Sequence, residues 1–126
     1  MKQELKEIIY DAAFEVRRHL CNGFLEKVYQ NALAIELSQR GLQVETEIPI
    51  KIHYKGHIVG DYRIDILVEN SVILELKSVE TILPIHEAQL VNYLTATGIN
   101  DGILINYGEN YIFRHKTRLY IPSNKH

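Results

Sequence analysis

Apolar residues in the first third of the chain recur at the spacing of an α-helix. In residues 3–20, apolar positions share one face and the other side is charged. Asn22-Gly23 interrupts this pattern, and a second stripe predicts a helix over residues 25–40, which Gly41 ends. The two stripes consist of Leu5, Ile8, Ile9, Ala12, Ala13, Val16 and Leu20, then Leu25, Val28, Tyr29, Ala32, Leu33 and Leu37.

After Gly41 the periodicity changes from helical to alternating. Alternation predicts three consecutive strands, and Pro49 marks an edge strand or a bulge in the first of them. A helix that follows Pro84 and is closed by Gly98 comes next, and then a short apolar strand. The predicted bounds are 44–54, 58–68 and 72–77 for the strands, with turns at 54–57 and 69–71, then 85–97 for the helix, 102–106 for the short strand and 111–120 as the candidate for a last strand. The tail from Pro122 is expected to fray.

This order predicts an α/β fold in which helices flank a mixed sheet. The length of 126 residues suits one domain over residues 1–126, and contents of 46% hydrophobic and 24% charged residues exclude a mainly disordered chain. No apolar run approaches the roughly 20 residues that span a bilayer. The N-terminus is charged and contains no signal core, so we expect a cytoplasmic protein without a membrane partner. The single cysteine, Cys21, excludes an internal disulfide and a zinc cage built from cysteines.

Three charged residues in the predicted meander form the candidate reactive centre: Asp65, Glu75 and Lys77. Side chains alternate along a strand, so Glu75 and Lys77 project from the same face. A turn centred on Asn70 places Asp65 directly across from Glu75. Facing carboxylates repel unless a cation compensates them, and carboxylate oxygens suit Mg²⁺ or Mn²⁺. The alternative is an exposed ion-pair ladder in which Lys77 neutralises both acids.

Two helices supply further candidates. Gln89 and Tyr93 are four residues apart and share a helix face, with His86 on the same side. Together they would contact a phosphate or a metal-bound water; in the alternative, Tyr93 is a core aromatic and His86 a capping residue. Glu26 is either a first-turn acid that favours the helix dipole or a further metal ligand. Glu36 lies near the apolar stripe and is expected to pair with a basic residue.

Several motifs resemble a known family. Residues 23–29, GFLEKVY, match the motif of the GxxExxY protein family, and GDYRIDILVENSVILELKSVE, HEAQLVNYL and GILINYG resemble the rest of that family in the same order. Over residues 5–114 the chain also resembles the PD-(D/E)XK nuclease superfamily, in the branch with a Gln-x-x-x-Tyr helix.

The resemblance implies a restriction-endonuclease-like core of helix, three-stranded meander, helix and strand, with a metal site at a strand bend. Carried over by motif, the functional residues are Glu26 as the first-helix acid, Asp65 as the metal-binding aspartate, Glu75 and Lys77 as the E-x-K pair, and Gln89 and Tyr93 as the Q-x-x-x-Y pair. We therefore expect hydrolysis of phosphodiester bonds in DNA or RNA, with Mg²⁺ or Mn²⁺ held by the two strand acids, the carbonyl of Leu76 and Glu26.

Charge limits how nucleic acid would be bound. The formal net charge is −2 with the histidines neutral, so the basic field that nucleic-acid-binding proteins usually carry is absent. A local patch or metal ions would have to replace it, and the candidate basic contacts are Lys55, Arg63, Arg114, Lys116 and Arg118.

Two other functions remain open. A binding module would keep the nuclease fold without cleaving its ligand. An assembly protein would form a homodimer through apolar positions, for which the candidates are Tyr107, Tyr111, Phe113 and Tyr120; these residues would otherwise complete the core.

Overall fold

The computed structural model describes residues 1–118. Its elements are α1 (Gln3–Leu20), α2 (Glu26–Gln39), β1 (Val44–Tyr54), β2 (His57–Val68), β3 (Val72–Lys77), α3 (Pro84–Thr97), β4 (Asp101–Asn106) and β5 (Ile112–Thr117). The expected order is confirmed, and each bound agrees within a few residues. The candidate last strand exists but ends at Thr117, and the tail from Pro122 and Tyr120 lie outside the described residues.

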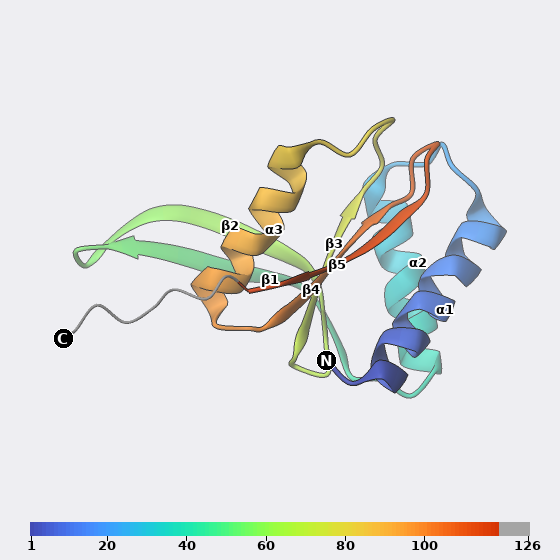
Figure 1. The fold of residues 1–126 in the computed structure, drawn as a ribbon, viewed down its shortest axis with the longest axis horizontal. Coiled ribbons are helices and arrows are strands. Elements are labelled where there is room, and N and C mark those ends of the chain that lie inside the picture. The colour runs from blue at the N-terminus through green and yellow to red at the C-terminus, as the bar shows by residue number, and fades with distance from the viewer. Residues whose placement is uncertain (119–126) are drawn as a thin grey trace.

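One mixed sheet, in the order β1-β2-β3-β4-β5, forms the centre of the molecule. Among the strands of residues 1–118, only the β3–β4 pair is parallel, and α3 makes the crossover connection that such a pair needs. Figure 1 shows α1 and α2 on one side of the sheet and α3 on the other. The α/β fold with flanking helices is therefore confirmed.

The face under α1 and α2 carries the larger apolar core. Val72, Leu74 and Leu76 of β3 are almost fully buried there, as the strand alternation predicts. Two aromatic rings stack at one end of this core, where the centroids of Tyr29 and Tyr107 lie 4.6 Å apart. The Tyr107 hydroxyl donates a hydrogen bond of 2.8 Å to the carbonyl of Ala13, so its polar atom is satisfied inside the core.

Within residues 1–118, α3 is the element that covers the opposite face, and the core there is smaller. Ile73 of β3 packs there with Leu90 and Leu94 of α3 and with Leu104 of β4. Gly102 of β4 lets the helix approach closely, because a Cβ atom at that position would lie 2.8 Å from Cδ1 of Leu90. The smaller core leaves space on this face for polar side chains at the end of β3.

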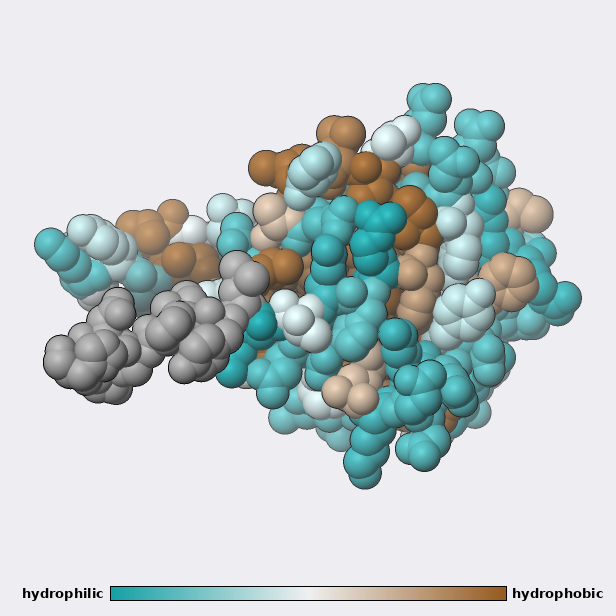
Figure 2. Space-filling model, in the orientation of Figure 1, coloured by the Kyte–Doolittle hydropathy of each residue, from teal (hydrophilic) through white to brown (hydrophobic). Residues whose placement is uncertain are grey.

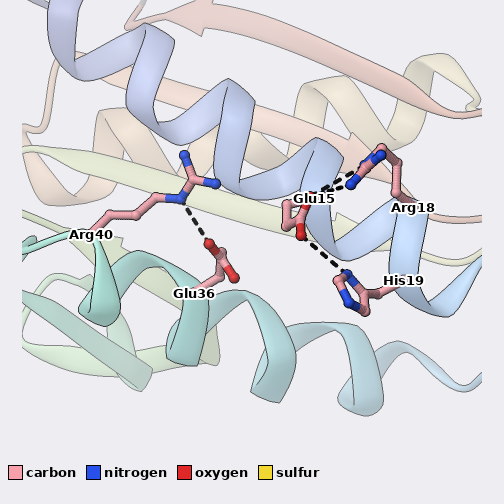
Figure 3. Close-up of polar contacts among 5 residues, drawn as sticks. All are labelled: Glu15, Arg18, His19, Glu36 and Arg40. Carbon is pink, nitrogen blue, oxygen red and sulfur yellow. Dashed lines mark hydrogen bonds and ion pairs between the residues drawn. The ribbon is translucent and has the colours of Figure 1, made fainter.

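Several ion pairs on α1 and α2 join two residues of the same helix. Figure 3 shows Glu15 between Arg18 and His19 on α1, and Glu36 with Arg40 on α2. The expected partner of Glu36 is thus a base one turn along the same helix, at 2.8 Å. Such pairs stabilise a helix by only about 0.3–0.5 kcal/mol, so packing between the two helices rests on their apolar faces.

The outer halves of β1 and β2 project beyond the rest of the sheet and are here named the arm, residues 51–63 (Figure 1). β1 is an edge strand with a register shift at Ile52/His53, which agrees with the expectation from Pro49. Most arm residues are exposed, including the apolar Ile58 and Val59.

No helix within residues 1–118 is both long and apolar enough to cross a membrane.

Candidate functional site

The β2–β3 hairpin has the register that the three-residue turn predicts. Val68 pairs with Val72 and Ile66 with Leu74, so Asp65 comes next to Glu75. The backbone ladder ends there, and side chains take over its hydrogen bonds. The amide of Asp65 donates to Oε1 of Glu75 at 3.2 Å, and the amide of Leu76 donates to Oδ2 of Asp65 at 2.8 Å. The two acids therefore occupy the point where β2 and β3 separate.

Both acids are largely removed from solvent. Glu75 is only 5% exposed, which excludes the exposed ion-pair ladder considered above. Burial, together with the neighbouring Asp65, raises the pKa of Glu75 to about 8. Burial also raises the pKa of Asp65, against the opposing effects of its bond to Leu76 and of the Lys77 charge. Two buried carboxyls with raised pKa values form a site in which negative charge is under-compensated.

Lys77 is joined to the α3 helix through hydrogen bonds. Its Nζ donates to Oε1 of Gln89 at 3.4 Å, and Nε2 of Gln89 donates to the hydroxyl of Tyr93 at 3.0 Å. The Tyr93 hydroxyl accepts this bond, so its own hydrogen remains available to donate to another group. Burial, with smaller effects of Glu75 and Asp65, raises the pKa of Tyr93 to about 12 and keeps it protonated.

Tyr93 and His86 illustrate the alternatives weighed from the sequence. Tyr93 is buried, as expected of a core aromatic, but its hydroxyl belongs to the Lys77 chain of hydrogen bonds. His86 caps α3, because the amide of Leu83 donates to its Nδ1 at 3.0 Å. The capping role expected in the alternative interpretation is therefore confirmed for His86.

Glu26 is the first residue of α2, and the loop before this helix holds it near the site. The Tyr29 hydroxyl donates to the carbonyl of Cys21 at 2.7 Å and accepts from the amide of Phe24 at 3.1 Å. Ser78, directly after Lys77, donates to the carbonyl of Phe24 at 3.0 Å. Burial and the Asp65 charge raise the pKa of Glu26, which places the carboxyl within electrostatic reach of the strand acids.

Glu47 and Lys27 stand beside this group, and the sequence analysis missed both. Glu47 has φ of 52°, and the β1–β2 ladder contains no Cα pair between Glu47 and Asp65. Its carboxylate forms an ion pair with Lys27, and its charge adds to the rise in the pKa of Asp65. The sequence contains no signal for this break in the ladder, because it arises from a left-handed backbone conformation at Glu47, a residue type that rarely adopts one.

Asn106 is a second missed residue, and it fixes the chain directly after Lys77. Oδ1 of Asn106 accepts from the amide of Val79 at 3.0 Å, and its Nδ2 donates to the Val79 carbonyl at 2.9 Å. The same side chain also bonds to the backbone of Gly108 and Asn110. The sequence signal for this role is the position of a polar Asn at the end of the apolar run GILIN. An amide buried there needs hydrogen-bond partners, and Asn106 is fully buried.

The five predicted basic contacts do not form one patch. Arg114 and Lys116 both form ion pairs with Glu87 of α3. Arg118 donates to the side chain of Asn100, and the Lys55 ammonium lies over the ring of Tyr54 in the arm. Arg63 is exposed on β2, and after Lys27 its charge also lowers the pKa of Glu47, so this member of the set acts on an acid beside the site.

Comparison with known proteins decides the family. The sequence profile of the PD-(D/E)XK nuclease superfamily matches residues 3–119. The chain belongs to the PD-(D/E)XK nuclease superfamily. A comparison with curated proteins finds no significant match.

Solved structures share the fold of this superfamily member. The crystal structure of SSO0001 superposes with a TM-score of 0.59 at 20% identity, covering 76% of this chain and 52% of that one. An alkaline exonuclease (LHK-Exo) from Laribacter hongkongensis gives 0.55 at 16% identity, covering 73% and 55%. The chain thus spans about half the length of these two proteins. LHK-Exo in complex with dAMP gives 0.50 at 14% identity, covering 90% and 82%.

PD-(D/E)XK nucleases generally use divalent metal ions, and the donor set here fits one. Within residues 1–118, no three His, Cys, Asp or Glu side chains form a ready-made metal cage. Mg²⁺ does not require one, since it keeps several waters and is usually bound by one or two carboxylates. The raised pKa values of Asp65 and Glu75 show that the two acids fit a metal ion, because a cation between them would relieve the repulsion that burial intensifies.

Proposed function

We propose that this protein is a metal-dependent nuclease that hydrolyses phosphodiester bonds in DNA or RNA. The observation that carries the proposal is the pair of acids at the end of the β2–β3 ladder, the buried Glu75 and the half-buried Asp65, with Lys77 two residues after Glu75 on the same face. We place the chain in the GxxExxY branch with the Gln-x-x-x-Tyr helix, and we treat residues 1–126 as one nuclease-like unit.

Four groups would hold Mg²⁺ or Mn²⁺. Asp65 and Glu75 would supply carboxylate oxygens, Leu76, which follows Glu75 on β3, would supply its carbonyl, and Glu26 would contribute from the start of α2. When bound, the metal would lower the pKa of a bound water and neutralise charge on the phosphate. The ladder bonds from the Asp65 and Leu76 amides orient both strand acids before any ligand arrives.

Lys77 and α3 would place the attacking water and the phosphate. The Lys77 ammonium sits on the acidic face, where its charge stabilises a negative phosphate oxygen in the transition state. Gln89 accepts from Lys77 and donates to Tyr93, so it fixes the direction of both groups. The hydroxyl hydrogen of Tyr93 is free to donate to a phosphate oxygen.

A non-catalytic binding module is the second candidate. It is favoured by the net charge of −2 and by the ion pairs that occupy Arg114 and Lys116, which leave little free positive charge for a substrate backbone. Such a module would bind metal and nucleic acid through the same acids without turnover.

Calorimetry and cleavage assays together test the proposal. We expect Mg²⁺ or Mn²⁺ to bind the wild-type protein and to support cleavage of labelled DNA or RNA, and we expect Asp65→Ala to lose both. Asp61→Ala is the matched control, because Asp61 lies on the same strand but pairs with Lys51 in the arm. Metal binding without cleavage of single- or double-stranded DNA and RNA would favour the binding module. Cleavage that persists in Asp65→Ala would contradict the proposed site.

A further inference from the structure

A groove of about 650 Å³ separates α3 from the arm. Its walls include Ile52, Val59 and Tyr62 from the arm and Ile85, Asn92 and Tyr93 from α3. Gly60 also lines it, and a Cβ atom there would lie 3.0 Å from the Tyr62 ring and 3.1 Å from Ile52. Because Gly60 has no side chain, the side chains of Ile52 and Tyr62 can both pack against its backbone.

The walls of the groove are apolar and aromatic although they face solvent. Val59 and Ile85 are 62% and 68% exposed. Tyr62 is 46% exposed, and its ring centroid lies 5.7 Å from that of Tyr93 with the rings tilted by 50°. Figure 2 shows apolar side chains on the arm and over the start of α3. Exposed apolar side chains that gather around a groove are typical of a ligand-binding site.

The groove is continuous with the candidate active site. Gln89 and Tyr93 line it, and the same two side chains extend the hydrogen-bond chain from Lys77. A polynucleotide whose phosphate lies beside Lys77 therefore has a neighbouring nucleotide at the mouth of the groove. The part of that nucleotide with apolar faces and polar edges is its base.

Charge makes an unpaired strand a better ligand than a duplex. Affinity for duplex DNA comes largely from contacts between basic residues and phosphates. Here Glu87 compensates the charges of Arg114 and Lys116, whereas Arg118 bonds to the uncharged Asn100 and keeps its charge. Two of the five candidate basic contacts therefore have little charge left for a duplex backbone. Stacking on aromatic rings can supply the missing affinity, but only to a base whose faces are not already covered by its neighbours.

We propose that the groove between α3 and the arm binds an unpaired nucleobase, so that the substrate is a single strand or an unpaired end. The base stacks on the exposed face of Tyr62, and the amide of Asn92 contacts the base edge. This inference rests on the proposed nuclease function, which places the phosphate of the strand beside Lys77. Base binding itself is measured separately from cleavage.

Binding is tested by fluorescence anisotropy with a short labelled DNA strand of mixed sequence and with the same strand in a blunt duplex. All variants carry Glu75→Gln, which prevents turnover while Mg²⁺ is present. We expect the single strand to bind more tightly than the duplex. Tyr62→Ala should weaken single-strand binding about tenfold, in line with the loss of one stacked base.

Two further variants make the test specific. Tyr54→Ala is the matched control, since Tyr54 is an exposed tyrosine on the same arm (61%) that does not line the groove. Ala88→Trp fills the groove from an exposed position on α3 without removing a buried side chain, and it should weaken binding as much as Tyr62→Ala does. Thermal unfolding checks that all three variants fold.

The outcomes separate the inference from the proposed function. Equal binding of duplex and single strand, with Tyr62→Ala unchanged relative to Tyr54→Ala, would overturn the base-binding groove and leave the nuclease proposal standing. In another outcome, the single strand binds in a way that depends on the groove, while the protein that retains Glu75 does not cleave it. This result would support the groove and overturn the proposed catalysis. Failure to bind either DNA would overturn the groove.

Discussion

The two faces of β3 carry opposite kinds of side chain. Toward α1 and α2 the strand presents Val72, Leu74 and Leu76, all buried in a continuous apolar core. Toward α3 it begins with Ile73 and then places Glu75 and Lys77 in a region that is nearly as buried. Burying charge without full compensation is unfavourable. One six-residue strand therefore stabilises the fold with one face and carries, at a cost in stability, the candidate chemistry on the other.

The largest effect should come from Glu75→Gln, which changes the charged face alone. Losing a metal-binding carboxylate should lower cleavage about a thousandfold, or about 4 kcal/mol of transition-state stabilisation. The metal-free variant should unfold at a higher temperature than the wild type at pH 8, because the buried negative charge is gone. Glu45→Gln, at an exposed position of β1, is the control. A variant that loses stability along with activity would show that Glu75 has a structural role instead.

Leu74→Ala tests the apolar face and should have the reverse pattern. Leu74 is fully buried, so truncation should lower the free energy of unfolding by about 2–5 kcal/mol. Metal affinity of the folded variant, measured by calorimetry at low temperature, should stay close to that of the wild type. Loss of metal binding in a folded Leu74→Ala protein would mean that the two faces are not independent.

Asn106→Ala tests the link between the two faces at the end of β3. Removing the side chain leaves the partly buried amide of Val79 and the buried amide of Gly108 without their acceptor, so we expect a loss of about 2–3 kcal/mol in denaturant unfolding. Asn31→Ala, at an exposed position of α2, should be nearly neutral. Equal stability of the two variants would exclude the bracing role of Asn106.

The charged face should also make the stability of the metal-free protein depend on pH. The pKa of Glu75 is raised in the fold from 4.5 to about 8, and the pKa values of Asp65 and Glu26 rise as well. The folded state therefore binds protons more tightly than the unfolded state. Its stability should fall as the pH rises from about 4.5 to about 8, although Lys77 partly offsets the effect.

Urea unfolding across this pH range measures the effect. Mg²⁺ should restore more stability at pH 8 than at pH 5, and Glu75→Gln should flatten the pH profile. A profile that rises from pH 4.5 to pH 8 in the wild type would contradict the raised pKa values.

The smallest effect should follow Glu36→Ala, far from both faces of β3. Its ion pair with Arg40 lies on the surface of α2, so the free energy of unfolding should change by less than about 0.5 kcal/mol. Thermal unfolding checks this, and a larger loss would mean that this pair also supports the packing of α2 against α1.

The sequence was sufficient for features that depend on local periodicity. Helical and alternating patterns placed every element, and the three-residue turn at 69–71 set the register that brings Asp65 to Glu75. Alternation along β3 also assigned Leu74 and Glu75 to opposite faces. These features follow from backbone geometry within one or two adjoining elements, so the residues concerned are close in sequence.

Other features required the tertiary structure. The sequence suggested Arg114 and Lys116 as contacts for nucleic acid, but Glu87 lies on α3 and reaches them only because that helix crosses the sheet beside β5. In the sequence, Asn106 is only the end of an apolar strand. Its bonds to Val79 depend on the parallel pairing of β3 with β4. Such contacts join residues far apart in the chain, where no periodic pattern relates them.

The arm gives one wall of the groove a different mechanical character from the other. Residues of β3 and β4 lie under helices, so their amides should exchange with solvent deuterium only through extensive unfolding, whereas arm residues have few buried neighbours. Amides in residues 51–63 should therefore exchange through local opening that leaves the buried acids in place. Local opening of this kind would admit a strand of nucleic acid to the groove from the side, without its end having to be threaded.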